Sequence, residues 1–278
     1  MRALLFAALA MLLTSTAEAA CTESWRAKLE GPAPVGFLPS RFGTGVAACA
    51  HDELELGAAA RAIVEPSDFY GNLSAAALVA GSFTFLERGA VFGSFEVLRY
   101  QTVISSLTAS TFAPGRPTVG ASWRFVESDA WVVTGFGRSL IPTDAVPYEN
   151  AKPFGVDAGA ALQLRLTEAW TGYGTFAALT TGAVSRGPAD LRFGFTTILG
   201  ATYRPTHGFA LVTEADARFG RGSALEYLAL GAGLRVHLDR RGFELFVKVP
   251  VAGRERSLAT LGLRLRYDFG VALDRRLR

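Results

Sequence analysis

The amino-acid sequence predicts an all-β fold, a transmembrane antiparallel up-and-down β-barrel. Three observations predict it: long segments of alternating apolar and polar residues, connections that alternate between short and long, and an N-terminal segment typical of exported proteins. The 278 residues are 50% apolar and 19% charged, a composition that excludes a disordered chain. No linker-like composition interrupts the chain after its first segment, so we expect one folded domain.

The first segment has the three parts of a secretory signal peptide. Arg2 precedes an apolar run over residues 3–13, and the small-x-small site at residues 17–19 follows it. We therefore predict a signal peptide over residues 1–19. The next part, residues 20–52, is then a periplasmic or plug segment in front of the barrel.

Cys21 and Cys49 are the two cysteines of the sequence. Since an exported chain enters an oxidising compartment, we expect a Cys21–Cys49 disulfide. A metal site formed by Cys49 and His51 is the weaker alternative, because two ligands are too few for structural zinc. Lipidation of Cys21 is disfavoured because Glu18 stands where a lipobox has an aliphatic residue.

Period-two alternation dominates the rest of the chain and places successive side chains on opposite faces of a strand. It is clear in 191–203, 228–238, 243–251 and 258–269, and poor near 90–103, 130–138 and 169–181. The clear runs extend over about 9–13 residues, the length that a tilted strand needs to cross a bilayer. The apolar face is predicted to meet lipid. The other face is rich in glycine and isolated charges, as in a barrel lumen.

The connections between strands alternate in length, with one weak member at 220–222, as short periplasmic turns and longer outer loops do in such barrels. The predicted turns lie at 87–89, 127–129, 167–168, 204–206 and 239–241. The predicted outer loops lie at 66–74, 105–117, 139–154, 182–189, 220–222 and 252–257. Twelve strands result over residues 53–269, followed by a tail at 270–278. A different interpretation of one hairpin gives ten or fourteen strands.

The last predicted strand resembles the β-signal of Gram-negative outer-membrane barrels. The pattern is Thr260-x-Gly262-x-x-Leu265-x-Tyr267-x-Phe269, followed here by nine further residues. The resemblance implies a bacterial outer-membrane location. It also implies that the barrel assembly machinery recognises Gly262, Tyr267 and Phe269.

The predicted inner face carries a mixed set of charges. The basic members are Arg61, Arg124, Arg165, Arg192, Arg218, Arg235, Lys248, Arg264 and Arg266. The acidic members are Glu55, Asp157, Asp190, Glu214, Asp216, Glu244 and Asp268. Two interpretations stay open: a polar pore with mild anion preference, and a network of ion pairs that fills a narrow barrel. Glycines 231, 233 and 262 suggest free space, which slightly favours the pore.

The sequence contains no motif that predicts a catalytic site, a metal site or a cofactor. The dinucleotide fingerprint at 43–48 is only formal because no strand precedes it. The basic residues are scattered singly among acids, so we expect no nucleic-acid partner.

We expect a monomeric passive channel for small polar or anionic solutes, embedded in outer-membrane lipid. The alternatives are a structural or surface-interaction barrel acting through its outer loops and, at low weight, a lipid-modifying enzyme.

Overall fold

The computed structural model describes residues 46, 48, 49, 53–65, 70–85, 88–104, 109–113, 115, 117–141, 152–184, 191–206, 208–220, 224–238, 241–253 and 259–268. Within them, no helix is long and apolar enough to span a membrane. The described strands are β1 (Glu53–Glu65), β2 (Tyr70–Phe85), β3 (Gly89–Ile104), β4 (Ala109–Ala113), β5 (Pro117–Glu127), β6 (Trp131–Leu140), β7 (Lys152–Arg165), β8 (Trp170–Val184), β9 (Arg192–Thr206), β10 (Phe209–Phe219), β11 (Leu225–Leu238), β12 (Arg241–Ala252) and β13 (Ala259–Asp268).

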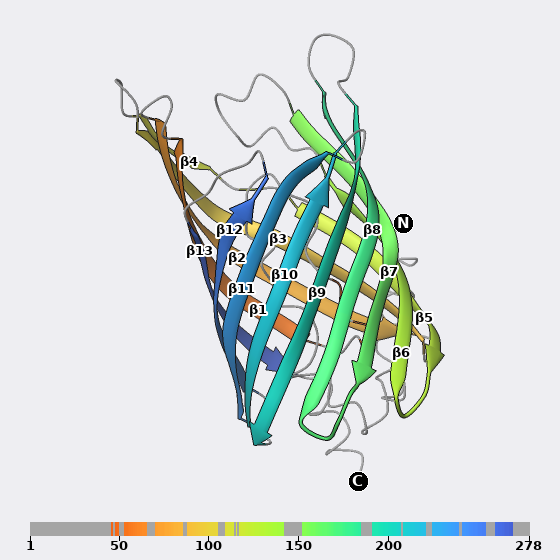
Figure 1. The fold of residues 1–278 in the computed structure, drawn as a ribbon. Coiled ribbons are helices and arrows are strands. Elements are labelled where there is room, and N and C mark those ends of the chain that lie inside the picture. The colour runs from red at the N-terminus through yellow and green to blue at the C-terminus, as the bar shows by residue number, and fades with distance from the viewer. Residues whose placement is uncertain are drawn as a thin grey trace, which may run out of the picture.

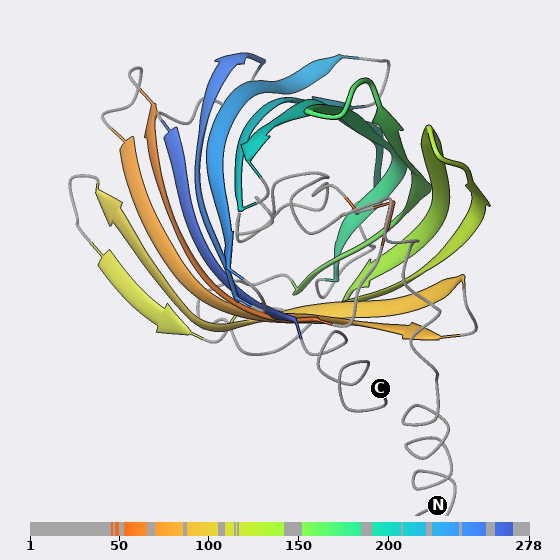
Figure 2. The same cartoon turned by 90° about the horizontal axis from the view of Figure 1, so that it is seen from below.

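The strands form one antiparallel sheet that closes on itself. Consecutive strands pair with each other, except that β5 pairs with β3 and not with β4, and β1 also pairs with β13. The ring therefore contains all the described strands except β4, which is twelve. Figure 2 shows this ring end-on around a central lumen. The predicted up-and-down barrel of twelve strands is confirmed.

Strand β4 corrects the predicted loop at 105–117. It pairs with the outer half of β3, while β5 pairs with the other half. The registers are continuous, since Arg99 lies opposite Ala113 and Phe95 lies opposite Pro117. Between them the Gly115 amide donates to the Glu96 carbonyl at 2.8 Å. β4 and β5 thus act as one interrupted strand. The sequence suggested a loop because Pro114 and Pro117 cannot donate hydrogen bonds to a neighbouring strand.

The two ends of the barrel differ in the length of their connections. Strands β2, β5, β7, β9 and β11 end at the lower end of Figure 1, where the next strand begins after two to four residues. We call this the turn end. The opposite end of the strands is here called the loop end, and most of the strand-to-strand gaps there are longer. The strand order agrees with the predicted alternation, but some predicted bounds are corrected: residues 70–74 belong to β2 and residues 204–206 to β9.

The outer face of the barrel is an apolar band. On β12, Phe243, Leu245, Val247, Val249 and Val251 are all exposed, while the residues between them are buried or half-buried. Tryptophans 123, 131 and 170 and Tyr267 are also exposed, and all lie toward the turn end. Such an aromatic girdle beside an apolar band is typical of membrane-embedded barrels.

The poor alternation near 90–103 comes from a bulge in β3. The register with β2 shifts between Ala77 and Leu78, so that Val97 has no partner of its own. Val97 and Leu98 are both about half exposed, whereas Glu96 and Arg99 on either side are both buried. A bulge adds one residue to one strand and inverts the alternation beyond it.

We expect a charge on the outer face to be costly. Leu263 lies in the middle of β13 and is 39% exposed on the apolar band. Leu263→Arg should lower the free energy of unfolding by about 2–4 kcal/mol near the bilayer midplane. Gly262→Ser on the lumen side should cost much less, because a Cβ there has no atom nearer than 4.0 Å. Denaturant unfolding in lipid vesicles measures both, and equal stability of Leu263→Arg and wild type would refute the lipid-facing assignment.

Candidate functional site in the barrel lumen

The lumen is lined by two unlike walls on opposite sides of the ring. The charged wall consists of ionisable side chains on β10–β13 and β1, and the apolar wall consists of small and apolar side chains on β6–β8. The charged wall is formed by Glu55, Glu214, Asp216, Arg235, Glu244, Lys248, Arg264 and Arg266. The apolar wall is formed by Val132, Thr134, Phe136, Ala161, Thr175 and Ala177.

One row of the charged wall alternates long side chains with glycines. The register places Tyr173, Gly200, Glu214, Gly231 and Lys248 opposite one another on five successive strands, β8 to β12. A Cβ on Gly200 would lie 2.3 Å from the Tyr173 ring, and one on Gly231 would lie 2.9 Å from Lys248 Cγ. Because these two strands carry no side chain in the row, the neighbouring side chains can reach across them.

Lys248 lies at the β12 end of this row and contacts two carboxylates. Its Nζ lies 3.2 Å from Glu214 Oε2 and 3.0 Å from Asp216 Oδ2. The Tyr173 hydroxyl donates to Glu214 Oε1 at 2.8 Å. Lys248 is only 2% exposed, so its charge is stabilised by the two carboxylates and not by bulk water. Two carboxylates against one ammonium leave the surroundings of Lys248 acidic.

The glycines of β11 are covered, which corrects the expectation of free space around them. A Cβ on Gly231 would lie 2.6 Å from the Phe246 ring, and one on Gly233 would lie 2.3 Å from it. Phe246 is on the inner face and is buried, and its ring occupies the space beside these two positions. Of the three glycines, only Gly262 leaves a site open for a Cβ.

A second cluster lies nearer the turn end and combines arginines with glutamates. Glu244 accepts from Arg264 at 2.7 Å and lies 3.2 Å from Arg235 Nε. Arg264 also donates to both Glu55 oxygens at 2.8 Å, and Arg266 Nε lies 3.3 Å from Glu55. Arg235, Glu244 and Arg264 are buried, whereas Arg266 is half-buried.

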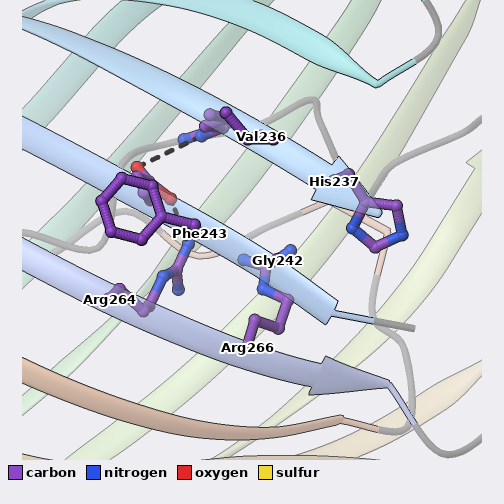
Figure 3. A pocket seen from close by; sticks show the side chains of 8 residues that line it. Val236, His237, Gly242, Phe243, Arg264 and Arg266 are labelled. Atoms are coloured by element: carbon purple, nitrogen blue, oxygen red, sulfur yellow. Dashed lines mark hydrogen bonds and ion pairs between the residues drawn. The ribbon is translucent and has the colours of Figure 1, made fainter. Parts of the chain in front are cut away.

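A small recess opens beside this cluster (Figure 3). Its lining includes Arg235, Glu244, Arg264 and Arg266 together with His237 on β11. The four basic side chains give the recess a predominantly basic lining. Among the described residues, no group of three or more metal-ligating side chains is placed to hold an ion.

Among the described residues, three further ion pairs lie outside the charged wall. Arg138 Nε donates to Asp157 at 3.0 Å on neighbouring strands, and both side chains are buried. The other two pairs are nearer the barrel ends: Arg218–Glu226 and Arg124–Glu127, each at 3.1 Å. The prediction missed Arg138 because β6 presents apolar residues on both faces. The available signal was Thr134, which lies four residues before Arg138 and therefore on the same face of the strand.

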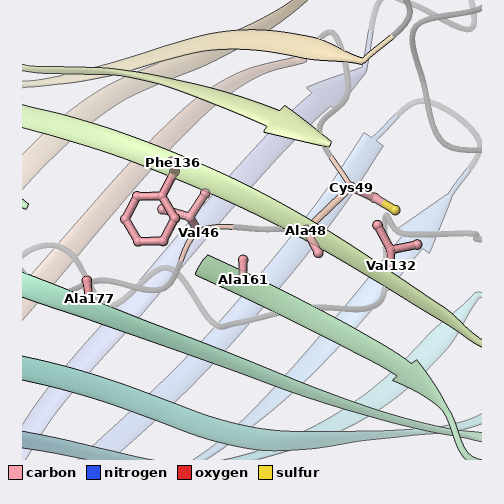
Figure 4. Packing of buried hydrophobic residues seen from close by; sticks show 7 residues of the cluster. All are labelled: Val46, Ala48, Cys49, Val132, Phe136, Ala161 and Ala177. Atoms are coloured by element: carbon pink, nitrogen blue, oxygen red, sulfur yellow. The ribbon is translucent and has the colours of Figure 1, made fainter. Parts of the chain in front are cut away.

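The apolar wall holds part of the segment that precedes the barrel. We call Val46, Ala48 and Cys49 the strap; all three are buried against the wall (Figure 4). The Thr134 hydroxyl donates to the Ala48 carbonyl at 2.6 Å, and the Thr175 hydroxyl donates to the Val46 carbonyl at 3.5 Å. This contact explains the poor alternation of β6 and β8, whose inner faces pack against protein.

Apart from Arg124, Asp157 and Arg218, whose ion pairs are described above, the predicted lining residues fall into three groups. Glu214, Asp216, Arg235, Glu244, Lys248, Arg264 and Arg266 meet on the charged wall with Glu55. Arg165 is half-buried at the turn end of β7, and Arg192 is exposed at the loop end of β9. Arg61 lies on β1 opposite Thr260, and Asp268 ends β13, but their side chains lie outside the described part, as does Asp190.

The fold can be compared with known proteins. No family model and no curated protein matches the sequence. An outer-membrane channel from Pseudomonas putida F1 superposes with a TM-score of 0.59 at 12% identity, covering 78% of this chain and 96% of that one. The KdgM porin, solved in complex with disordered oligogalacturonate, gives 0.53 at 8% identity, covering 77% and 99%. The translocator domain of the autotransporter NalP from Neisseria meningitidis gives 0.52 at 11% identity, covering 79% and 89%.

These likenesses establish the fold and leave the function to the site. Channels and an autotransporter domain share the architecture, so the ring of strands does not by itself select between them. What this chain transports or binds must be argued from its own lumen.

The bridging carboxylate Glu244 should contribute strongly to stability. Glu244→Gln would leave Arg235 and Arg264 buried with one carboxylate fewer, which costs about 3–5 kcal/mol for a broken buried pair. The matched control is Glu127→Gln, whose pair with Arg124 is more exposed and is worth about 0–1 kcal/mol. Urea unfolding of the three proteins compares them, and similar losses for both variants would contradict the assigned role of Glu244.

The predicted disulfide has a direct chemical test. Cys49 is the only cysteine in the described part and is not a free thiol. Cys21 lies outside the described residues, so its pairing with Cys49 stays a prediction. Thiol labelling of the unreduced, denatured protein should modify neither residue, and labelling after reduction should modify both. Modification of both before reduction would rule out the bridge.

Proposed function

We propose that the protein is an exported, monomeric barrel of the bacterial outer membrane that forms a passive channel for small polar or anionic solutes. The exposed apolar band and its aromatic girdle support the location, because such a surface is stable only against lipid. The similar structures include an outer-membrane channel and a porin, which agrees with a transport role for this fold.

The observation that carries the proposal is the charged wall. Buried ion pairs stabilise a protein poorly in comparison with apolar packing of the same volume. Apolar side chains such as those on β6–β8 would stabilise a purely structural barrel at least as well. The charged wall instead extends from the recess at Arg266 to Lys248 and Asp216, on the side of the lumen opposite the strap. Its side chains provide polar contacts to a solute crossing the lumen.

The proposal includes the processing of the chain. Residues 1–19 are removed as a signal peptide, residues 20–52 form the plug segment with its Cys21–Cys49 bridge, and residues 270–278 form a tail. The assembly machinery recognises the last strand through Gly262, Tyr267 and Phe269. Tyr267 is exposed on the outer face and supports this role, whereas Phe269 lies outside the described residues. No catalytic activity, cofactor or nucleic-acid partner is assigned.

The anionic preference rests on the recess. Arg266 is the most accessible guanidinium of its cluster, with 16% of its side chain exposed, while Arg264 has 7% and Arg235 has 5%. A fixed positive charge at a narrow mouth raises the local concentration of anions. For Arg235 and Arg264 the sequence left both a pore lining and an ion-pair network open, and their contacts with Glu244 support the network at these two positions.

Planar-bilayer recordings test the proposal. The purified protein should produce discrete conductance steps, and Arg266→Glu should shift the reversal potential toward cation selectivity in a salt gradient. Arg241→Glu is the matched control, because Arg241 lies on β12 near the same end but is exposed on the outer face. It should leave the reversal potential unchanged.

Two outcomes would contradict the proposal. If wild type and Arg266→Glu form conducting pores with the same selectivity, the ions do not pass along the recess. Absence of conductance from wild type and from every variant that folds would favour a structural or surface-interaction barrel. Separation of outer from inner membranes, followed by immunoblotting, checks the location independently.

A further inference from the structure

We propose that Lys248 and Asp216 form an isopeptide bond, a covalent amide between two side chains that links β12 to β10. The bond is a self-modification of the folded chain, made once and with the loss of one water molecule. It goes beyond the proposed channel function and does not depend on it. It assigns a reaction to a buried amino group that a passive channel does not need.

The two reacting groups are already in contact. Lys248 Nζ donates to Asp216 Oδ2 at 3.0 Å, and the carbon that an amine would attack is bonded to this oxygen. Groups held about 3–3.5 Å apart in a fixed orientation react far faster than the same groups free in solution. The fold therefore supplies the proximity that amide formation between side chains requires.

This contact crosses a whole strand. Lys248 lies on β12 and Asp216 on β10, with β11 between them. The register places Gly231 of β11 between Lys248 and Glu214, and a Cβ on Gly231 would lie 2.9 Å from Lys248 Cγ. The glycine therefore lets the lysine stem pass close over β11. Asp216 is two residues beyond Glu214, on the same face of β10.

Glu214 is the third group that the reaction needs. Its Oε2 lies 3.2 Å from Lys248 Nζ, and its Oε1 accepts from the Tyr173 hydroxyl at 2.8 Å. Amide formation requires a group that takes a proton from the nitrogen and returns it to the departing oxygen. Glu214 is placed for this role, because it contacts the nitrogen on one side and is held by Tyr173 on the other.

The site is dry on the side of the lysine. The side chains of Lys248 and Glu214 are 2% and 0% exposed, and the centroid of the buried Phe246 ring lies 5.7 Å from Nζ. Little bulk water is present to favour the reverse reaction, hydrolysis. The amide also removes two buried charges that are costly to desolvate. Asp216 has 15% of its side chain exposed, so the released water can leave on its side.

The step balances within the chain. One proton passes from the Lys248 ammonium to the Asp216 carboxylate, which gives an amine and a carboxylic acid. The amine attacks Cγ of Asp216 and a C–N bond forms. Glu214 then takes a second proton from the nitrogen and delivers it to the departing hydroxyl, the C–O bond breaks, and water leaves. Glu214 returns to its carboxylate form, and no oxidant, reductant or further reactant is consumed.

Trypsin digestion of the denatured protein, isolated from outer membranes, tests the bond directly. Trypsin cleaves after a free lysine but not after an acylated one, so an unlinked chain releases residues 242–248 and 249–254 separately. In a linked chain, residues 242–254 stay together and carry residues 193–218, which contain Asp216. Mass spectrometry should find this branched product, lighter than its two parts by one water molecule. Fragmentation should locate the link at Lys248 and Asp216.

Three variants examine the individual roles. Lys248→Arg keeps the positive charge but has no amine to acylate, so residues 242–248 should be released. Glu214→Gln keeps the shape of the side chain and should slow bond formation by about 100-fold, measured as the linked fraction against time after refolding. Glu226→Gln is the matched control, since Glu226 pairs with Arg218 and should leave the bond as in wild type. Heat-modifiable migration on gels checks that each protein folds.

The outcomes distinguish a covalent bond from an ion pair. The branched product in wild type and Glu226→Gln, with slow formation in Glu214→Gln, supports the proposal. Complete release of residues 242–248 from folded wild type overturns it, whether or not the variants fold. A link located at Glu214 overturns the assignment of Asp216, and a wild-type rate in Glu214→Gln overturns the proton transfer by Glu214. Conductance enters none of these results, so they stand apart from the test of the channel.

Discussion

Pairing of β1 with β13 is the constraint on which the rest of the structure depends. Ten residue pairs from Glu53 opposite Asp268 to Ala62 opposite Ala259 close the sheet. Without this pairing, two strand edges would expose unpaired backbone groups, which a bilayer cannot satisfy. Closure also encloses the inner face. Side chains that would reach bulk water from an open sheet must then find partners across the lumen.

The glycine rows show how those partners are reached. Adjacent strands in a sheet lie about 4.8 Å apart, so side chains on alternate strands are separated by the one between them. Gly200 and Gly231 remove that obstacle, and Tyr173, Glu214 and Lys248 meet across the four intervals of β8–β12. Glycine usually weakens a strand because it contributes no packing. Here the missing side chain is what allows an ion pair to span the wall.

The division into two walls relates the architecture to the proposed transport role. A uniformly charged lumen would have no place for an apolar segment, and a uniformly apolar one would resist polar solutes. By placing charge on β10–β1 and small apolar groups on β6–β8, the barrel holds part of its own chain on one side and keeps a polar surface on the other. The comparison with channels and an autotransporter domain is consistent with one scaffold whose lumen decides its use.

The sequence by itself determined the barrel, its strand number and the alternation of turns and loops, because lipid imposes period-two patterning on every outward residue. It also identified most members of the charged wall, since Arg264 and Glu244 alternate with leucine, valine and phenylalanine along their strands. Only the tertiary structure decided which of these charges meet. Arg264 and Glu55 are 209 positions apart, and their contact depends on barrel closure.

The apolar wall was likewise beyond the sequence. Val132, Phe136 and Ala177 are apolar at positions where the alternation predicts polar lumen residues. Local alternation alone therefore does not place their side chains inside the barrel. Their true partner is the strap, which lies more than 80 positions earlier than Thr134. Local periodicity records which face of a strand is apolar. It does not record whether that face is covered by lipid or by a distant segment of the same chain. Both environments exclude water, so both favour the same apolar side chains.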